Sequence, residues 1–243
     1  MWSGAISFGL VNVPVKLYSA VSRKTVRFNQ LNAETGNRIQ QKRVDPETGE
    51  EVGYDQIVKG YELTKDRYVV ITPDELESLD PEKTRTVDIE DFVDLDEIDP
   101  VYYDHPYYLV PDKGATKAYG LLLGAMKQAN KVAIARVVLR SKEQLVAIRP
   151  SGDVLMMETM LFHDEVVPSH DIEDLPDGKD LKATDRELKM AEQLIDSLSS
   201  EFDPTSYHDE YREKVLELIE KKADSASNGS SKSGSKSKSK AKA

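Results

Sequence analysis

The histidine, acidic and glycine residues are the first places to look for catalytic chemistry. The histidines, His105, His163, His170 and His208, include no pair with the spacing of zinc ligands. Because the chain has no cysteine, a thiol nucleophile, a disulfide and cysteine-ligated zinc are all excluded. Neither of the glycine-rich phosphate-binding motifs, G-x-x-x-x-G-K and G-x-G-x-x-G, occurs. We therefore expect no enzyme, no metal and no cofactor.

One arrangement of acidic and basic residues leaves a nuclease open as an alternative. Asp177 is followed by Glu187 and Lys189 at the spacing of a metal-dependent nuclease motif, which needs its Glu-x-Lys on a strand beside the aspartate. Residues 184–187 instead read Thr-Asp-Arg-Glu, a capping box that predicts the start of a helix. In that helix Glu187 would already bond to backbone amides, which weakens the nuclease alternative.

The basic residues form a more coherent set. One group lies in the first sixty residues and another follows Val132, where alternation along a continuing strand would place Arg136, Arg140 and Lys142 on one side. A flexible tail adds lysines separated by serine and alanine, which would contribute further phosphate contacts. The predicted phosphate-binding residues are Lys16, Arg23, Lys24, Arg27, Arg38, Lys42, Arg43, Lys59, Arg136, Arg140, Lys142, Lys232, Lys236, Lys238, Lys240 and Lys242.

The net charge of −11 would by itself argue against nucleic acid, but the charge is unevenly distributed. Residues 113–149 contain eight Lys or Arg and a single acid, whereas the acidic residues concentrate in 71–112 and 150–222. Electrostatic attraction to phosphate acts within a Debye length of ~8 Å at physiological salt, so the local charge decides. A polyanion-binding surface is therefore compatible with the composition.

The aromatic residues argue against recognition of bases. Tyr18, Phe28 and Tyr54 are isolated, and no pair on neighbouring strands resembles a stacking platform for single strands. The predicted helix at 115–129 is apolar over too wide a stripe to lie in a DNA groove. These patterns favour contact with phosphates without sequence specificity. The alternative is an interaction module that uses the same basic face to bind acidic or phosphorylated peptides.

The hydrophobic pattern predicts a mainly β protein with some α structure, a β-barrel with insertions around one buried helix. Residues 23–60 are polar and rich in turns, which predicts a long arm without a core of its own. Pro14 predicts an edge or a bulge in its strand. No apolar run is long enough to span a membrane and the N-terminus lacks a secretory pattern, so we expect a cytoplasmic protein. The expected strands are 5–10, 11–18, 68–72, 87–92, 106–110, 132–139, 144–148 and 154–161, and the expected helices are 73–79, 115–129, one from 184 and one after Pro204.

Four runs of sequence resemble the bacterial Ku proteins. They are residues 1–18 (MWSGAISFGLVNVPVKLY), 56–62 (QIVKGYE), 131–140 (KVAIARVVLR) and 187–191 (ELKMA), in the order expected for that family. The resemblance extends over about residues 1–222. It implies a Ku-type barrel core over 1–170 with the arm at about 30–60, a helical segment over 171–222 and a disordered tail over 223–243.

The resemblance also implies a function. Bacterial Ku proteins are homodimers in which two barrels and two arms form a ring around duplex DNA, thread over a broken end, protect it and recruit the multifunctional DNA ligase of end joining. By this resemblance Lys16 lies at the base of the arm, Arg23, Lys24 and Arg27 enter it, and Arg38, Lys42 and Arg43 lie on it. Arg140 and Lys142 would lie at a barrel turn that faces the DNA, and residues 184–222 would meet the ligase. The protein would then be associated with the nucleoid.

The chain departs from the family pattern at one point. Many relatives have a Cys-x-x-Cys at the turn of the arm, where this chain has Val44-Asp45-Pro46-Glu47-Thr48-Gly49. Asp, Pro and Gly in this order predict a plain turn. We therefore expect no metal in the arm.

Overall fold

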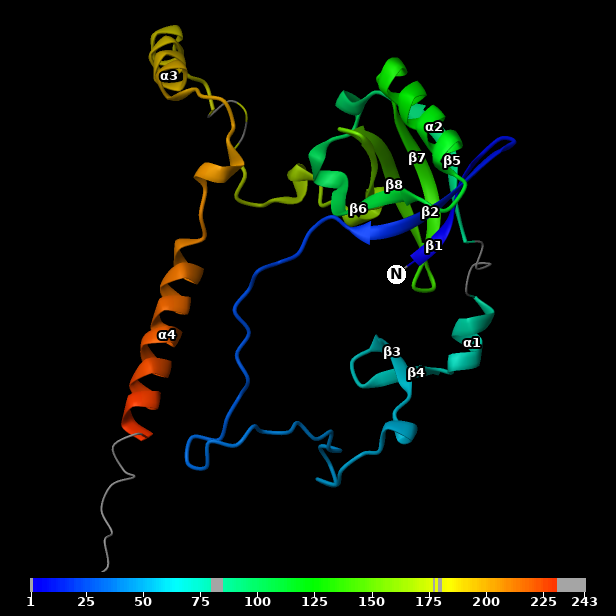
Figure 1. Ribbon diagram of the computed structural model, residues 1–243. Coiled ribbons are helices and arrows are strands. Elements are labelled where there is room, and N and C mark those ends of the chain that lie inside the picture. Colours follow the sequence, from blue (N-terminus) through cyan, green and yellow to red (C-terminus); the bar gives the residue numbers. More distant parts are fainter. Residues whose placement is uncertain (1, 80–84, 177, 179–180, 231–243) are drawn as a thin grey trace, which may run out of the picture. The chain divides into compact units, whose positions relative to one another are not determined.

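The chain divides into two compact units. The computed structural model describes residues 2–79, 85–176, 178 and 181–230, with the side chains of 226–230 left out (Figure 1). The first unit comprises Met1–Ser22 and Gln41–Glu173, and the second comprises Arg23–Gln40 and Asp174–Ala243.

The first unit contains a closed barrel of seven strands in the order β1-β2-β6-β9-β8-β7-β5 (Figure 1). Adjacent strands are antiparallel except β1 and β5, whose parallel pairing closes the barrel. Closure pairs every strand on both sides and leaves the barrel without an open edge. The strands are β1 (Trp2–Phe8), β2 (Val11–Ser19), β5 (Thr86–Val93), β6 (Tyr103–Pro111), β7 (Val132–Leu139), β8 (Lys142–Ser151) and β9 (Val154–Met160).

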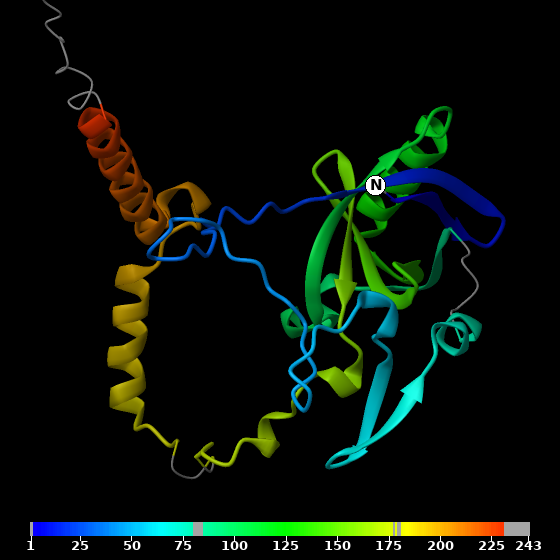
Figure 2. The same cartoon turned by 90° about the horizontal axis from the view of Figure 1, so that it is seen from below.

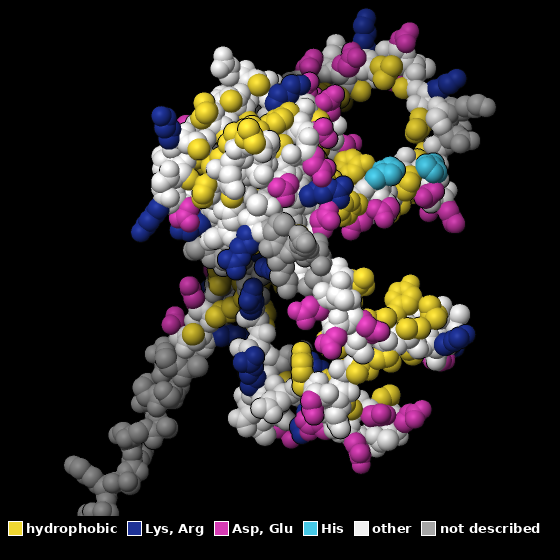
Figure 3. Space-filling model, turned by 90° about the vertical axis from the view of Figure 1, so that its right-hand side faces the viewer, with side chains coloured by type: hydrophobic (Ala, Val, Ile, Leu, Met, Phe, Trp, Pro, Cys, Tyr) yellow, Lys and Arg dark blue, Asp and Glu magenta, His cyan; other side chains and the backbone are white. Residues whose placement is uncertain are grey.

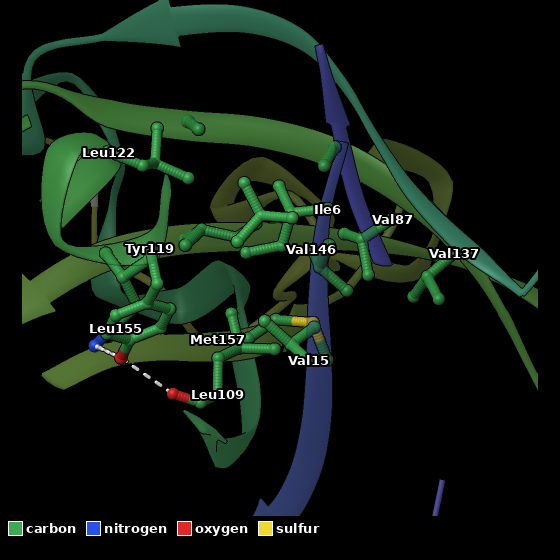
Figure 4. Packing of buried hydrophobic residues seen from close by; sticks show 14 of the residues in the cluster. Ile6, Val15, Val87, Leu109, Tyr119, Leu122, Val137, Val146, Leu155 and Met157 are labelled. Atoms are coloured by element: carbon green, nitrogen blue, oxygen red, sulfur yellow. Dashed lines mark hydrogen bonds between the residues drawn. The ribbon is translucent and has the colours of Figure 1, made fainter. Parts of the chain in front are cut away.

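Alternation along the strands fills the barrel. In β2 the side chains of Val13, Val15 and Leu17 are buried, while the residues between them face outward. Figure 4 shows Val15 and Ile6 converging with side chains from the opposite strands. Because apolar residues alternate with outward-facing ones, every second side chain of such a strand points into the core.

Helix α2 (Thr116–Ala129) packs against the same core through Tyr119, Leu122 and Met126. The buried hydroxyl of Tyr119 donates a hydrogen bond to the carbonyl of Leu109 and accepts one from the amide of Leu155, both 2.7 Å long (Figure 4). These two bonds connect the helix to strands β6 and β9. The predicted barrel and its buried helix are confirmed.

Two features differ from the sequence-based expectation. Strand β3 (Lys59–Thr64), whose first two residues fall in the predicted arm and whose others were assigned to no element, pairs with β4 (Arg67–Ile71) in a separate two-stranded sheet, the β3–β4 hairpin (Figure 2). Pro14 was predicted to mark an edge or a bulge, but β2 pairs on both sides. Proline is tolerated because pairing with β6 begins only at Val15, so the missing amide hydrogen costs no ladder bond there.

The remaining helices follow their capping signals. Helix α3 (Asp185–Leu198) begins after Thr184 with the predicted capping box, and α1 (Pro73–Ser78) begins after Thr72 with a second capping box that the sequence analysis did not identify. Helix α4 (Glu210–Ser230) follows in the second unit. No helix among the described residues is both long and apolar enough to cross a membrane. Short 3-10 helices are η1 (Tyr54–Gln56), η2 (Leu95–Glu97), η3 (Pro100–Tyr102), η4 (His163–Glu165), η5 (Ser169–Asp171) and η6 (Pro204–Ser206).

Candidate nucleic-acid interface

Two turns of the same construction organise residues 31–52. In the first, Asn32 Oδ1 accepts hydrogen bonds from the amides of Glu34 and Thr35, and Gly36 adopts a φ of 69°. The second repeats this pattern from Asp45, whose Oδ1 accepts from the amides at 47 and 48, with a φ of 72° at residue 49. Glycine takes these left-handed positions without the strain of a Cβ atom. The predicted plain turn at 45–49 is confirmed.

These turns position the predicted arm residues. Arg38 follows the first turn and forms an isolated bridge with Leu31, while Arg43 precedes the second. The guanidinium of Arg43 lies 5.1 Å from the centre of the Tyr54 ring, a cation–π contact. Lys42 forms an ion pair of 2.5 Å with Glu51. The exposed residues Arg23, Lys24 and Arg27 lie in the irregular segment after β2.

Arg136, on the outer face of β7, is already neutralised. Its Nε lies 2.9 Å from Glu90 and its Nη1 lies 2.5 Å from Glu143. Hydrogen bonding to Glu143 and the charge of Glu90 raise the pKa of Arg136 above its usual range. Glu90 sits at a register shift between β5 and β7, a bulge that interrupts the ladder. Arg136 could contact a phosphate only after its ion pairs with Glu90 and Glu143 are broken.

Lys16, at the predicted base of the arm, is also paired. Its ammonium lies 2.9 Å from a carboxylate oxygen of Asp112. A hydrogen bond to Asp112 raises the pKa of Lys16, and the same bond lowers the pKa of Asp112. Part of the charge of Lys16 is therefore compensated within the barrel.

Arg140 and Lys142 are arranged differently from the strand-based prediction. The strand β7 ends at Leu139, and Arg140 and Ser141 have φ angles of 52° and 68°, which define a tight two-residue hairpin turn. The extended geometry that would have aligned Arg136 with Arg140 and Lys142 therefore does not persist. Arg140 instead lies at a barrel turn, as the family resemblance implies. Arg140 also lines a pocket of about 430 Å³ beside Trp2.

The predicted basic residues thus fall into paired and unpaired groups. Within the described residues, Lys16, Lys42 and Arg136 have carboxylate partners. The unpaired cations, a name we keep for this group, are exposed and have no ion pair in the described part of the chain: Arg23, Lys24, Arg27, Arg38, Arg43, Lys59, Arg140 and Lys142. Figure 3 shows one face of the molecule, on which Lys and Arg lie among Asp and Glu. The tail residues Lys232, Lys236, Lys238, Lys240 and Lys242 lie outside the described residues.

The structure adds basic residues that the sequence analysis did not select. Lys65 and Arg67 flank Asp66 at the end of the β3–β4 hairpin that also carries Lys59. Asp66 has a φ of 62°, as a turn residue needs. These residues were missed because polar residues interrupt the apolar pattern of β3, so the sequence analysis predicted no strand before the turn.

The residues of the nuclease alternative do not meet in the described structure. Glu187 lies in the first turn of α3, where its carboxylate accepts hydrogen bonds from the amide and hydroxyl of Thr184. These bonds lower the pKa of Glu187. Asp177 lies outside the described residues. In the part of the chain that the structure describes, no three His, Asp or Glu side chains are grouped as a metal site would require.

Fold and surface together define a closed seven-stranded barrel protein with exposed cations on its hairpin turns and its irregular segments. A family model described as Ku, the Ku70/Ku80 beta-barrel domain, matches residues 7–190, and the chain belongs to the Ku family. The fold expected from the resemblance is thereby confirmed.

Three relatives show the extent of the similarity. A protein named non-homologous end joining protein Ku from Anaeromyxobacter sp. (strain K) is 52% identical over 225 residues, which cover 92% of this chain and 75% of the relative. A protein of the same name from Heliobacterium modesticaldum is 46% identical over 222 residues, which cover 91% of this chain and 80% of the relative. The Opitutus terrae protein of the same name is 41% identical over 225 residues, covering 93% and 80%.

Proposed function

We propose that this protein forms a homodimeric ring that binds double-stranded DNA ends without sequence specificity, protects them and recruits the end-joining DNA ligase. Its role would be double-strand break repair by non-homologous end joining. The observation that carries the proposal is membership of the Ku family. Relatives named for non-homologous end joining align with more than nine-tenths of the chain. The Ku family is one of DNA-binding structural proteins and not of known enzymes.

The unpaired cations support a phosphate-binding role. An exposed Lys or Arg without a carboxylate partner can release a counterion from DNA without first breaking an ion pair. Arg38 in the second unit and Arg140 on the barrel are of this kind. No recognition helix or aromatic platform accompanies them in the described residues, in agreement with binding to the backbone alone.

Exposed apolar side chains support the proposed protein partners. Tyr61 and Val69 lie opposite each other on the β3–β4 hairpin, and both are exposed. Burial of such a face against a second copy would stabilise a homodimer. Helix α3 likewise exposes Leu194 and Leu198, which supports a contact with the ligase. A protein engaged with chromosomal DNA would be found with the nucleoid.

Competition between linear and closed circular DNA of one sequence tests the ring. A ring threads only from an end, so linear duplex should compete far better than the circle at every salt concentration. DNA that is circularised after loading should retain the protein. Equal competition by both forms would leave a basic surface that binds phosphate anywhere, and would support the alternative of an acidic- or phosphopeptide-binding module.

A charge reversal tests the participation of the arm. Arg38→Glu combined with Arg43→Glu should abolish binding to ends and leave the dimer intact. Lys214→Glu with Lys221→Glu is the matched control, because both lysines lie in α4 and pair with glutamates of their own helix. Unchanged affinity in the arm variant would remove the arm from the DNA contact. Binding that survives deletion of the arm would favour the peptide-binding alternative.

A further inference from the structure

The turn between β1 and β2 projects from the barrel and carries apolar side chains (Figures 1 and 2). Phe8 pairs with Val11, so Gly9 and Leu10 form a two-residue turn, and the φ of 57° at Gly9 suits its first position. Leu10 is fully exposed, and Val11 and Phe92 are exposed as well. The ring of Phe92 lies 6.2 Å from that of Phe8 in an edge-to-face contact. We call Phe8, Leu10, Val11 and Phe92 the apolar tip.

The local structure does not require an apolar residue at position 10. Hairpin turns favour Gly, Asn, Asp and Ser, which suit the turn conformation and the contact with water. Because the side chain of Leu10 is fully exposed, it contributes nothing to the barrel core. Single exposed apolar residues are common, but a cluster of them on a projecting turn indicates a surface that binds another protein.

The surroundings of the apolar tip are acidic. Asp88 of β5 lies opposite Ser7 of β1, Asp91 directly precedes Phe92, and both aspartates are exposed. Residues 2–15 contain no Lys or Arg. The two carboxylates would repel the phosphates of DNA. The expected partner of the tip is therefore an apolar surface with positive charge at its edge.

The barrel carries such a surface at the end where β1 begins. The pocket of about 430 Å³ beside Trp2, which we call the mouth pocket, keeps apolar surface available because Trp2, Tyr107 and Leu139 are only partly buried. Among the described residues no carboxylate lines it, and Arg140 is its one charged residue. The lining residues are Trp2, Leu17, Ser19, Tyr107, Leu139 and Arg140. The mouth pocket therefore complements the apolar tip in both polarity and charge.

The apolar tip and the mouth pocket lie at opposite ends of one hairpin. Trp2 pairs with Leu17 at the pocket, and Phe8 pairs with Val11 at the tip. Strands rise about 3.3 Å per residue, which places the two ends of β1 roughly 20 Å apart. A copy cannot insert its own tip into its own pocket, but it can insert the tip into the pocket of a second copy. Such a contact is heterologous, so each pair of copies still has a free tip and a free pocket.

We propose that the apolar tip of one copy docks in the mouth pocket of a second copy, with Leu10 against Trp2 and Leu139. An aspartate beside the tip would then approach Arg140. This head-to-tail contact is distinct from the closed dimer of the proposed function and does not depend on it. A contact made by four side chains is small, and small interfaces are weak and transient. Copies that are held close together would associate more strongly, because their effective concentration is higher.

The absence of cysteine from the chain allows this contact to be trapped as a disulfide. Leu10→Cys in one protein and Ser19→Cys in another should form a disulfide-linked pair when they are mixed in oxidised glutathione. The double variant should form a ladder of covalent trimers and longer chains on a non-reducing gel, because its two thiols are too far apart to join within one copy. Leu121→Cys with Ser19→Cys is the matched control, since Leu121 is an exposed leucine of α2, and should give at least tenfold less ladder.

Sedimentation velocity gives a second readout without cysteines. The mean mass of the unchanged protein should rise beyond the dimer with concentration, and Leu10→Ser should need about tenfold or more protein for the same rise. Leu121→Ser should behave like the unchanged protein. Because Leu10 is fully exposed, Leu10→Ser should keep the melting temperature of the unchanged protein.

Three results would overturn the proposal. One is an equal yield of ladder from the control pair, and another is an unchanged concentration dependence in Leu10→Ser. The third is efficient linkage of Leu10→Cys to itself, which would indicate a two-fold contact between tips. Arg140 is also one of the unpaired cations, so both measurements are made without DNA, and their failure would leave the proposed DNA binding unaffected.

Discussion

The barrel, which is antiparallel except at its β1–β5 pair, and the β3–β4 hairpin are both sheet structures rich in β-branched residues, but they bury these residues differently. In β8 the consecutive residues Val146, Ala147 and Ile148 are completely inaccessible. In the hairpin Tyr61 is 67% exposed and Val70 is 53% exposed. Strand-forming residues therefore specify local structure in both regions, whereas only the barrel supplies the opposing layer that covers them.

The physical reason lies in the number of strands. A closed sheet covers its own inner face and has no open edge. A two-stranded sheet has two open edges and no inner face, and is at best marginally stable alone in water. The barrel is expected to be stable by itself, while the hairpin gains stability only when a partner covers it.

A pair of truncations should show the largest difference between the two regions. Ile148→Ala removes a fully buried side chain and should cost about 2–5 kcal/mol in the free energy of unfolding. Val70→Ala, on the exposed hairpin, should change that free energy by no more than about 0.5 kcal/mol. Urea denaturation at low protein concentration measures both. Equal costs would mean that the hairpin is as well packed as the barrel, which would contradict the comparison.

Two Tyr→Phe substitutions, each of which removes only a hydroxyl, test the same contrast between barrel and hairpin. Tyr119→Phe leaves the carbonyl of Leu109 and the amide of Leu155 without their shared partner. We expect a loss of about 1–3 kcal/mol, the penalty for buried polar groups left unsatisfied. Tyr68→Phe, in the hairpin, should have almost no effect. Thermal unfolding of the two variants checks this expectation, and an unchanged melting temperature for Tyr119→Phe would mean that water replaces the lost bonds.

Within the barrel, the paired and unpaired cations can be compared through the salt dependence of DNA binding. Arg140→Gln with Lys142→Gln should lower the slope of log affinity against log salt by about 2, close to one unit for each lost phosphate contact. Arg136→Gln should leave the slope unchanged because Glu90 and Glu143 already occupy this side chain. Titrations of a short duplex at several salt concentrations distinguish the two outcomes. A reduced slope for Arg136→Gln would show that DNA displaces its carboxylate partners.

The smallest effect is expected from the ion pair between Lys16 and Asp112. The pKa of Asp112 is lowered from its ordinary value of 3.8, so its stabilising contribution is present above that pH and is lost as the pH falls through the lower, folded-state value. The pKa of Lys16 is raised from 10.5, so its contribution is lost only as the pH rises beyond that value. Asp112→Asn should therefore lower the melting temperature slightly near neutrality, where this contribution is present, and should remove the part of the acid-induced fall below about pH 4 that Asp112 causes. Both side chains remain about one-third accessible to solvent, at 33% for Lys16 and 36% for Asp112, which keeps the effect small.

Much of the fold could be predicted from local patterns. Alternation identified the barrel strands, the apolar stripe identified α2, and the capping box at Thr184 marked the start of α3. The assignment failed at β3, where Lys59, Gly60 and Glu62 interrupt the apolar pattern and only pairing with β4 defines the strand. For the candidate site, residue types indicated which side chains could contact phosphate, but gave no information on which of them already had a carboxylate partner.

The sequence by itself determined the family, the secondary structure of the barrel and the concentration of basic residues in 113–149, because these depend on residue type and order along the chain. Only the tertiary structure decided that Arg136 is neutralised by Glu90 and Glu143 while Arg140 is not. Glu90 and Arg136 are 46 residues apart. Ion pairing depends on distances of a few ångströms between residues far apart in the chain, and those distances exist only after the strands have closed into the barrel.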